Sequence, residues 1–383
     1  MKWESKRLAD LGVVSTGSTP RTAFPHFYGG DIPFVTPADL DSSEPITVSP
    51  RNLTSAGAAE ARMLPEGAVM MCCIGTLGKI GIAGRSLATN QQINSIVFDR
   101  TLVYPKFGYY ACRLLRPAME CMAPATTLPI ISKSKFQELQ IPLPPLAEQK
   151  RIAAILDAAD ALRAKRREAL AQLDALLQSS FLTLFGDPVT NPLGWERKKF
   201  SQIGSLDRGV SKHRPRNAPE LLGGHYPLVQ TGEVANCDTY IRDYKNTYSE
   251  IGLKQSKLWP AGTLCITIAA NIAKTGILAF EACFPDSVVG FRADDPATVH
   301  FAKTWLSFLQ KMLEETAPES AQKNINLEIL RNLVVPLPPL PLQQKFAAIV
   351  ESIECQKTAQ RGHLAELDAL FAALQHRAFR GEL

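Results

Sequence analysis

Short loops rich in glycine, hydroxyl, amide and basic side chains occur in the first half of the chain. Residues 17–21 read GSTPR, residues 75–79 read GTLGK, and residues 90–92 read NQQ. Residues 126–135, TTLPIISKSK, add two lysines. Cations and backbone amides bind phosphate, whereas arginine, lysine, asparagine, glutamine and threonine form hydrogen bonds with base edges. These residue types predict a nucleic-acid surface, and the alternative for each of them is an ordinary solvated side chain.

The second half carries a comparable set of side chains. Its densest basic cluster is residues 212–216, KHRPR, and Lys274 occupies a place equivalent to Lys79. The equivalent lysines predict a shared contact with phosphate. The candidate binding residues are Thr19, Arg21, Thr76, Lys79, Gln91, Gln92, Lys133 and Lys135 in the first half, and Lys212, His213, Arg214, Arg216, Asn271, Lys274, Gln322 and Lys323 in the second.

These loops belong to two halves that repeat one another. Residues 141–150 read IPLPPLAEQK, and residues 335–344 read VPLPPLPLQQ, 194 positions later. The sequences that follow keep the same register over about 40 residues, which indicates a tandem duplication. The predicted order is a globular unit at 1–145, a helix at 146–186, a globular unit at 187–339 and a helix at 340–383.

Each PLPPL segment precedes a long helical pattern. Proline excludes the segment itself from a helix. Apolar residues then recur with 3–4 spacing, which favours a coiled-coil seam over a helix that packs only on its own domain. We predict that the two helices form an antiparallel coiled coil. The expected seams are Ile155, Ala159, Leu162, Arg166, Ala169, Leu173, Leu176 and Ser180, and Phe346, Ile349, Ile353, Gln356, Gln360, His363, Leu367, Leu370 and Leu374.

Both predicted seams become polar at mid-length. Arg166 interrupts the first, and Gln356, Gln360 and His363 interrupt the second. We expect these polar residues to meet and to set the register of the two helices. The alternative is that they face solvent.

The composition is that of a folded protein. The chain has 383 residues, a net charge of +5 and 45% hydrophobic residues, and its excess positive charge lies outside the helices. This distribution favours an anionic partner for the globular units. The N-terminal sequence lacks the apolar stretch of a signal peptide, so a cytoplasmic location is expected. The eight cysteines have no C-x-x-C spacing and are expected to be reduced.

The duplicated motif resembles that of a known family. The PLPPLxxQ segment followed by a heptad helix, used twice, is similar to the specificity subunit of type I restriction–modification enzymes, and residues 16–40 resemble the start of their target-recognition domains. The resemblance implies an α+β fold in which two similar target-recognition domains, each a mixed β-sheet with helices, are separated by the two helices in pseudo-two-fold symmetry. Each domain reads one half of a bipartite sequence in double-stranded DNA.

The resemblance also implies partners and cofactors. The helices set the spacing between half-sites and dock two modification (methyltransferase) subunits, and restriction subunits, which are ATP-dependent translocases and nucleases, join the complex. S-adenosylmethionine, ATP and Mg²⁺ belong to those partners, and none is expected in this chain.

The second half departs from the family pattern in places. It lacks a counterpart of the opening at residues 17–21 and of residues 90–92, and Leu342 stands where the first half has Glu148. Divergent loops are consistent with two different half-sites. The change at Leu342 leaves open whether both docking surfaces are equivalent.

Enzymatic motifs are weak in this sequence. Residues 75–79 lack the full G-x-x-x-x-G-K-[ST] pattern, and the six histidines have no metal-ligand spacing. We therefore expect no catalytic residue and no metal site. The alternatives are a DNA-modifying enzyme with an unrecognised site, a coiled-coil adaptor, and a repressor acting alone.

Overall fold

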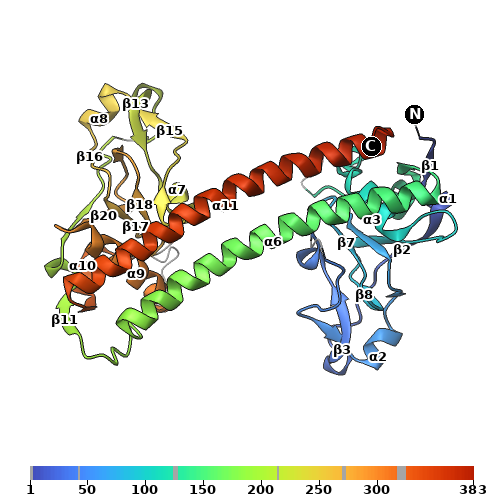
Figure 1. Ribbon diagram of the computed structural model, residues 1–383, viewed down its shortest axis with the longest axis horizontal. Coiled ribbons are helices and arrows are strands. Elements are labelled where there is room, and N and C mark those ends of the chain that lie inside the picture. The colour runs from blue at the N-terminus through green and yellow to red at the C-terminus, as the bar shows by residue number, and fades with distance from the viewer. Residues whose placement is uncertain (1–2, 42–43, 124–127, 214, 270–272, 317–324) are drawn as a thin grey trace. The chain divides into compact units, whose positions relative to one another are not determined.

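The computed structural model divides the chain into two compact units (Figure 1). Unit 1 comprises residues 1–168 and 362–383, and unit 2 comprises residues 169–361. Each contains one globular domain and parts of both long helices. The structure describes residues 3–41, 44–123, 128–213, 215–269, 273–316 and 325–383.

Two small sheets form the globular domain of unit 1. The first has the strand order β2-β9-β6-β7, all antiparallel, and the second has the order β4-β3-β8-β5. Successive side chains of a strand point to opposite faces, so Val69 and Met71 of β6 enter one core while Met70 and Cys72 enter another. Burial on both faces explains the uninterrupted apolar run of this strand. The strands are β2 (Gly12–Thr16), β9 (Ile93–Phe98), β6 (Val69–Cys72), β7 (Ile80–Ile82), β4 (Asn52–Leu53), β3 (Tyr28–Val35), β8 (Leu87–Thr89) and β5 (Met63–Leu64).

A short ribbon and several helices complete unit 1. Strand β1 (Ser5–Arg7) pairs antiparallel with β10 (Gln140–Pro142). This pairing joins the start of the domain to the PLPPL segment at residues 142–146. Phe107 and Tyr110 of one helix pack in the same core as the β-sheet. The helices are α1 (Leu8–Leu11), α2 (Ser55–Ala59), α3 (Pro105–Arg113), α4 (Arg116–Met122) and α5 (Lys133–Glu138).

Unit 2 repeats this plan. Its larger sheet has the order β12-β20-β17-β18-β14, its smaller sheet the order β15-β13-β19-β16, and β11 pairs with β21 as β1 pairs with β10. The strands are β11 (Glu196–Lys199), β12 (Ser205–Arg208), β13 (Leu222–Leu228), β14 (Tyr240–Ile241), β15 (Asn246–Tyr248), β16 (Leu258–Trp259), β17 (Leu264–Thr267), β18 (Thr275–Leu278), β19 (Ala282–Cys283), β20 (Val288–Arg292) and β21 (Val334–Leu337). The helices are α7 (Thr231–Asn236), α8 (Glu250–Lys254), α9 (Pro296–Thr316) and α10 (Leu327–Asn332). The predicted α+β class and the internal duplication are confirmed.

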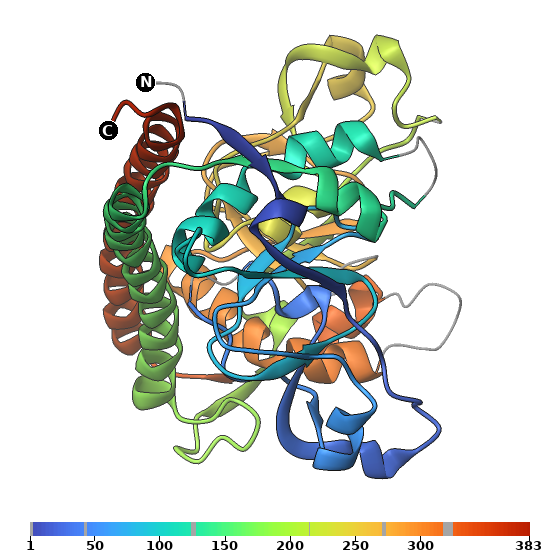
Figure 2. The same ribbon diagram turned by 90° about the vertical axis from the view of Figure 1, so that its right-hand side faces the viewer.

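The two long helices are α6 (Leu146–Phe185) and α11 (Leu340–Arg380). Figure 2 shows their segments side by side within each unit. In unit 1 the start of α6 packs with the end of α11, and in unit 2 the end of α6 packs with the start of α11. Within each unit the helix segments are therefore antiparallel, as predicted.

The predicted seams are partly wrong. Leu162, Leu176 and Leu370 were assigned to them but are about half exposed. A helix segment here faces its own globular domain as well as the other helix, which rotates the buried stripe away from a two-helix seam. The buried positions of the two helices are Gln149, Ile152, Ala153, Leu156, Ala159, Asp160, Arg163, Leu177, Phe181 and Phe185, and Gln343, Phe346, Val350, Ile353, Glu354, Lys357, Phe371, Gln375 and Ala378.

Candidate nucleic-acid interface

Three of the predicted loops of unit 1 lie at one end of the β2-β9-β6-β7 sheet. Strands β2 and β6 end at Thr16 and Cys72, whereas β9 and β7 begin at Ile93 and Ile80. Because these strands are antiparallel neighbours, the segments that leave β2 and β6 and those that enter β9 and β7 share an edge. The topology thus brings together loops that are far apart in the sequence, such as those of Thr19 and Gln91, which are 72 residues apart.

The loops at residues 17–21 and 90–92 contact each other directly. The Thr19 hydroxyl donates a hydrogen bond to Gln91 Oε1 at 2.5 Å, and the Ser18 amide donates to the Thr89 carbonyl oxygen at 2.9 Å. Gly17 makes this approach possible, because a Cβ there would lie 2.2 Å from the Asn90 carbonyl oxygen. Thr19, Arg21 and Gln91 are exposed at this edge.

The loop at residues 73–79 joins the segment that precedes α5. The Gly75 amide donates to the Pro129 carbonyl oxygen at 3.0 Å, and the Ile131 amide donates to the Cys73 carbonyl oxygen at 2.8 Å. Thr76 is exposed and Lys79 is half-buried. The loop at residues 73–79 and the segment at residues 129–131, which were predicted as separate sites, thus lie against each other and form one continuous edge.

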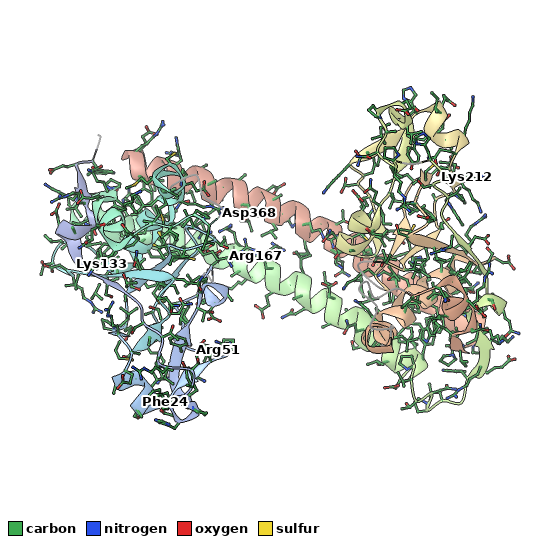
Figure 3. The ribbon with its side chains drawn as sticks, turned by 180° about the vertical axis from the view of Figure 1, so that it is seen from behind. Phe24, Arg51, Lys133, Arg167, Lys212 and Asp368 are labelled. Atoms are coloured by element: carbon green, nitrogen blue, oxygen red, sulfur yellow. The ribbon has the colours of Figure 1, made fainter. Side chains whose placement is uncertain are left out.

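Three of the predicted binding residues, Gln92, Lys133 and Lys135, differ in their exposure and in the hydrogen bonds that they already make within the protein. Gln92 is half-buried, and its Oε1 accepts a hydrogen bond from Asn90 Nδ2 at 2.9 Å. Lys135 Nζ donates to the Met122 carbonyl oxygen at 2.8 Å, which gives it a structural role. Lys133 is exposed in the first turn of α5, as Figure 3 shows.

The equivalent edge of unit 2 has the same backbone geometry. The Gly209 amide donates to the Val288 carbonyl oxygen at 2.8 Å, just as Gly17 donates to Ile93 at 3.0 Å. A Cβ at Gly209 would lie 2.3 Å from the Phe284 carbonyl oxygen. Unit 2 therefore keeps a glycine at the start of this loop, whereas the side chains that follow, in the sequence RGVSKHRPRN, differ from the Gly-Ser-Thr-Pro-Arg opening of unit 1.

The basic cluster of unit 2 lies at this edge. The backbone amides of Lys212 and His213 both donate to Gln255 Oε1, at 2.7 and 3.1 Å, which orders the loop. Lys212 is exposed, whereas Arg216 forms an ion pair with Asp286. Of the other predicted residues, Arg214, Asn271, Gln322 and Lys323 lie outside the described part of the chain.

Lys79 and Lys274 occupy equivalent positions, as the sequence predicted. The carbonyl oxygen of Lys79 accepts a hydrogen bond from the Cys72 amide at 2.8 Å, and that of Lys274 accepts one from the Thr267 amide at 3.0 Å. Each lysine follows a residue with positive φ, which is Gly78 at 79° and Ala273 at 56°. Both side chains are half-buried, and each lysine directly precedes a strand, β7 or β18.

Sequence reasoning missed one cation at the edge of unit 1. Arg62 is exposed, its amide donates to Ser18 Oγ at 2.9 Å, and its guanidinium donates to the Thr16 carbonyl oxygen at 2.8 Å. The duplication could have revealed Arg62, because another cation, Lys257, stands 195 positions later in the second half. The Lys257 ammonium lies 3.8 Å from the centre of the Trp259 ring. A cation thus stands at the same place in both halves.

Among the described residues, neither a metal cluster nor a reactive thiol at Cys73 or Cys112 is found. Among those residues, no group of three or more His, Cys, Asp and Glu side chains is arranged to hold a metal ion. Burial raises the pKa of the Cys73 and Cys112 thiols to about 12, so neither is a thiolate at neutral pH. None of the described helices is both long and apolar enough to span a bilayer.

Comparisons with known proteins agree with this geometry. A family profile described as the type I restriction modification DNA specificity domain matches residues 1–172 and 192–368. The MjaIX specificity subunit of Methanocaldococcus jannaschii is 24% identical over 408 residues, which cover 100% of this chain and 93% of the relative. The HindI specificity subunit of Haemophilus influenzae is 37% identical over 99 residues, which cover 25% and 22% of the two chains.

Solved structures show the same fold. The specificity subunit from M. genitalium aligns with a TM-score of 0.58 at 15% identity, over 99% of this chain and 96% of that one. A chain from a study of type I restriction–modification complex assembly aligns with a TM-score of 0.56 at 21% identity, over 100% and 98%. Because the family profile covers both halves, the chain belongs to the type I restriction–modification DNA specificity family and is a specificity subunit of that kind.

Proposed function

We propose that each unit reads one half of a bipartite DNA target through loops at one end of a sheet, which is β2-β9-β6-β7 in unit 1 and β12-β20-β17-β18-β14 in unit 2. This assignment rests on the equivalent loop edges of the two units, which follow β2 in unit 1 and β12 in unit 2. The backbone geometry is the same at both edges, but the side chains differ. Thr19 and Gln91 stand at the first edge, and Lys212 and Arg216 at the second. A common scaffold with divergent side chains suits two different half-sites.

The helices α6 and α11 set the spacing between half-sites and dock two modification subunits. Restriction subunits complete the assembly. Support comes from membership of the specificity family and from the two PLPPL segments, each of which joins a globular domain to a long helix. The chain acts in the cytoplasm, where its DNA target and these subunits meet.

Catalysis and its cofactors belong to the partner subunits in this proposal. S-adenosylmethionine, ATP and Mg²⁺ bind those subunits, and this chain supplies recognition. A methylation assay with S-adenosylmethionine tests this division between recognition and catalysis. The chain alone is expected to leave DNA unmethylated, whereas the chain together with modification subunits is expected to methylate it. Methylation by the chain alone would instead identify an enzyme.

The half-site assignment is tested by mapping methylated adenines with the reconstituted methyltransferase. Substituting Thr19 and Gln91 together by alanine relaxes the specificity of one half-site and leaves the other intact. Substituting Lys212 and Arg216 has the converse effect. Loss of both half-sites in either variant would contradict the division of labour, and unchanged specificity in both would remove these loops from base recognition.

A further inference from the structure

A buried ionic cluster links α6 and α11 in unit 1. Arg163 is 8% exposed, and its Nε lies 2.6 Å from Asp368 on the other helix. The Arg163 guanidinium also pairs with Asp160, which is 3% exposed. Arg113 of α3 lies 3.8 Å from Asp160, and the guanidinium carbon of Arg163 stands 4.4 Å above the Phe371 ring. The cluster therefore joins both helices to the globular domain.

Three residues of this cluster recur in unit 2 at a displacement of 194 positions: Asp160 as Glu354, Arg163 as Lys357, and Asp368 as Asp174. Lys357 is 3% exposed, and its ammonium lies 2.6 Å from Asp174 on the other helix and 3.5 Å from Glu354. It also lies 3.9 Å from Asp238, which pairs with Arg361 and belongs to the globular domain. Charged side chains are seldom buried unless they are paired. Their recurrence at matched positions indicates a selected arrangement.

The duplication makes this cluster sensitive to helix direction. The two helices carry the same charge pattern, so a parallel pair in register would place Arg163 beside Lys357 and Asp174 beside Asp368. Reversing one helix turns each like-charge pair into an opposite-charge pair, Arg163 with Asp368 and Lys357 with Asp174. A single duplicated pattern thus specifies an antiparallel partner.

The cluster also discriminates between registers. Apolar positions repeating every seven residues tolerate a slip of one heptad. In one direction that slip would bring Arg361 opposite Arg163 and Arg167 opposite Lys357. In the other direction both buried cations would lose the carboxylates across the interface, which is costly in a protein interior. Figure 3 shows Arg167 and Asp368 on the two helices, and the atoms of this pair lie 3.4 Å apart in the native register.

We propose that the clusters Asp160–Arg163–Asp368 and Glu354–Lys357–Asp174 are the register lock of the helix pair, and so position the two recognition domains for one half-site spacing. The expectation that Arg166, Gln356, Gln360 and His363 meet at mid-length concerns other positions of the two helices and stays a prediction. The lock is a positioning device: none of its residues needs to touch DNA. The link to spacing rests on the proposed function, whereas the register itself does not.

Register is measured by double electron–electron resonance between spin labels at Leu162→Cys and Leu370→Cys, which are exposed on the two helices within unit 1. The exposed Cys121 and Cys355 are first replaced by serine. The native lock gives one narrow distance. A heptad slip moves the labels by about 10 Å at 1.5 Å per residue. The test variant replaces the lock with leucine through D160L, R163L, D368L, D174L, E354L and K357L.

An all-leucine interface keeps the helices packed, since buried ion clusters are often replaceable by apolar side chains without loss of stability. We expect a melting temperature at or above the native value together with a broad or two-peaked distance distribution. A distribution as narrow as the native one overturns the proposal. If the variant aggregates, Arg163→Glu places a third carboxylate against Asp160 and Asp368, and the same broadening is required of it.

Matched substitutions separate this role from general stabilisation. Arg163→Lys reproduces the residue that unit 2 uses, and should keep the native distance distribution. Arg116→Leu removes an exposed ion pair with Glu120 on α4, outside the two long helices, and should also keep it. Broadening in Arg163→Lys that equals the all-leucine variant would contradict a lock based on charge.

Spacing is then measured with the same proteins in the complex with modification subunits. The probe is a pool of duplexes in which the two half-sites are separated by spacers of different length. We expect the native chain to select one length and the all-leucine chain to bind adjacent lengths within about tenfold of it. If the register changes while the preferred spacer length does not, the register lock stands. That result would show that the helices do not set the spacing between half-sites. Unchanged register and unchanged spacing together reject the lock.

Discussion

Nε2 of Gln149 lies 2.8 Å from the carbonyl oxygen of Pro144, five residues earlier. The equivalent Gln343 Nε2 lies 2.7 Å from the Pro338 carbonyl oxygen. Both glutamines are nearly inaccessible to solvent. This contact explains the PLPPLxxQ motif: proline makes an extended segment whose carbonyl oxygen needs a donor, and the glutamine in the first turn of the helix supplies it.

Gln149→Ala is expected to destabilise unit 1. Gln149 also donates to the Leu102 carbonyl oxygen at 2.9 Å and accepts from the Tyr104 amide at 2.8 Å, so the substitution leaves several buried groups without partners. The expected loss is about 1–3 kcal/mol. This corresponds to a melting temperature lower by several degrees, read by calorimetry. Gln344→Ala, at an exposed position, is the control and should shift the melting temperature far less.

Gly17→Ala is expected to disrupt the first recognition edge. The new methyl group would meet the Asn90 carbonyl oxygen and Thr89 Oγ1 at 2.2 and 2.3 Å, so the two loops must move apart at a cost of about 1–3 kcal/mol. DNA affinity and the stability of unit 1 should both fall. Gly232→Ala, where no atom lies within 4 Å of the new Cβ, should leave them unchanged. Equal behaviour of the two variants in a binding titration would remove the loop contact from recognition.

Lys79→Ala and Lys274→Ala are expected to weaken binding to all DNA sequences by a similar factor. A lysine that contacts phosphate releases counterions on binding, so each substitution should reduce the slope of log affinity against log salt by about one unit. The measurement is a titration at several salt concentrations with a specific and a random duplex. Lys150→Ala on α6 serves as the control. A change confined to the specific duplex would reassign these lysines to base contacts.

Unit 2 is expected to lose stability in mild acid because of His300. Burial lowers the pKa of its imidazole from the usual 6.5, with Lys303 acting in the same direction and Glu351 and Glu354 opposing it. The folded state therefore binds this proton less readily than the unfolded state. Stability is full above pH 6.5 and declines as the pH falls from there toward the lowered value.

The corresponding experiment compares melting temperatures from pH 7 to pH 5. His300→Gln should flatten this dependence, whereas His376→Gln, at an exposed position on α11, should retain it. The Tyr240 hydroxyl lies 3.4 Å from His300 Nε2, so Tyr240→Phe tests whether that neighbour contributes. An undiminished acid-induced decline in His300→Gln would assign it to other groups.

The sequence by itself determined the duplication and the α+β class, and it singled out the candidate binding loops. Residues 69–75, VMMCCIG, and 93–98, INSIVF, are short apolar runs of the kind that predicts buried strands, and the structure contains β6 and β9 there. The signals were local or periodic, so they could be read without knowing what packs against what. The resemblance to the specificity family rested on the same periodic motif.

Tertiary structure decided which of those residues meet. The contact between Thr19 and Gln91 spans 72 residues and depends on strand order, which the sequence does not state. Periodicity placed Leu162 in the seam and left Arg163 outside it, because the 3–4 spacing from Ile155 and Ala159 falls on Leu162. Its carboxylate partner Asp368 comes from a helix 205 residues away, and only that pairing makes a buried cation stable at this position.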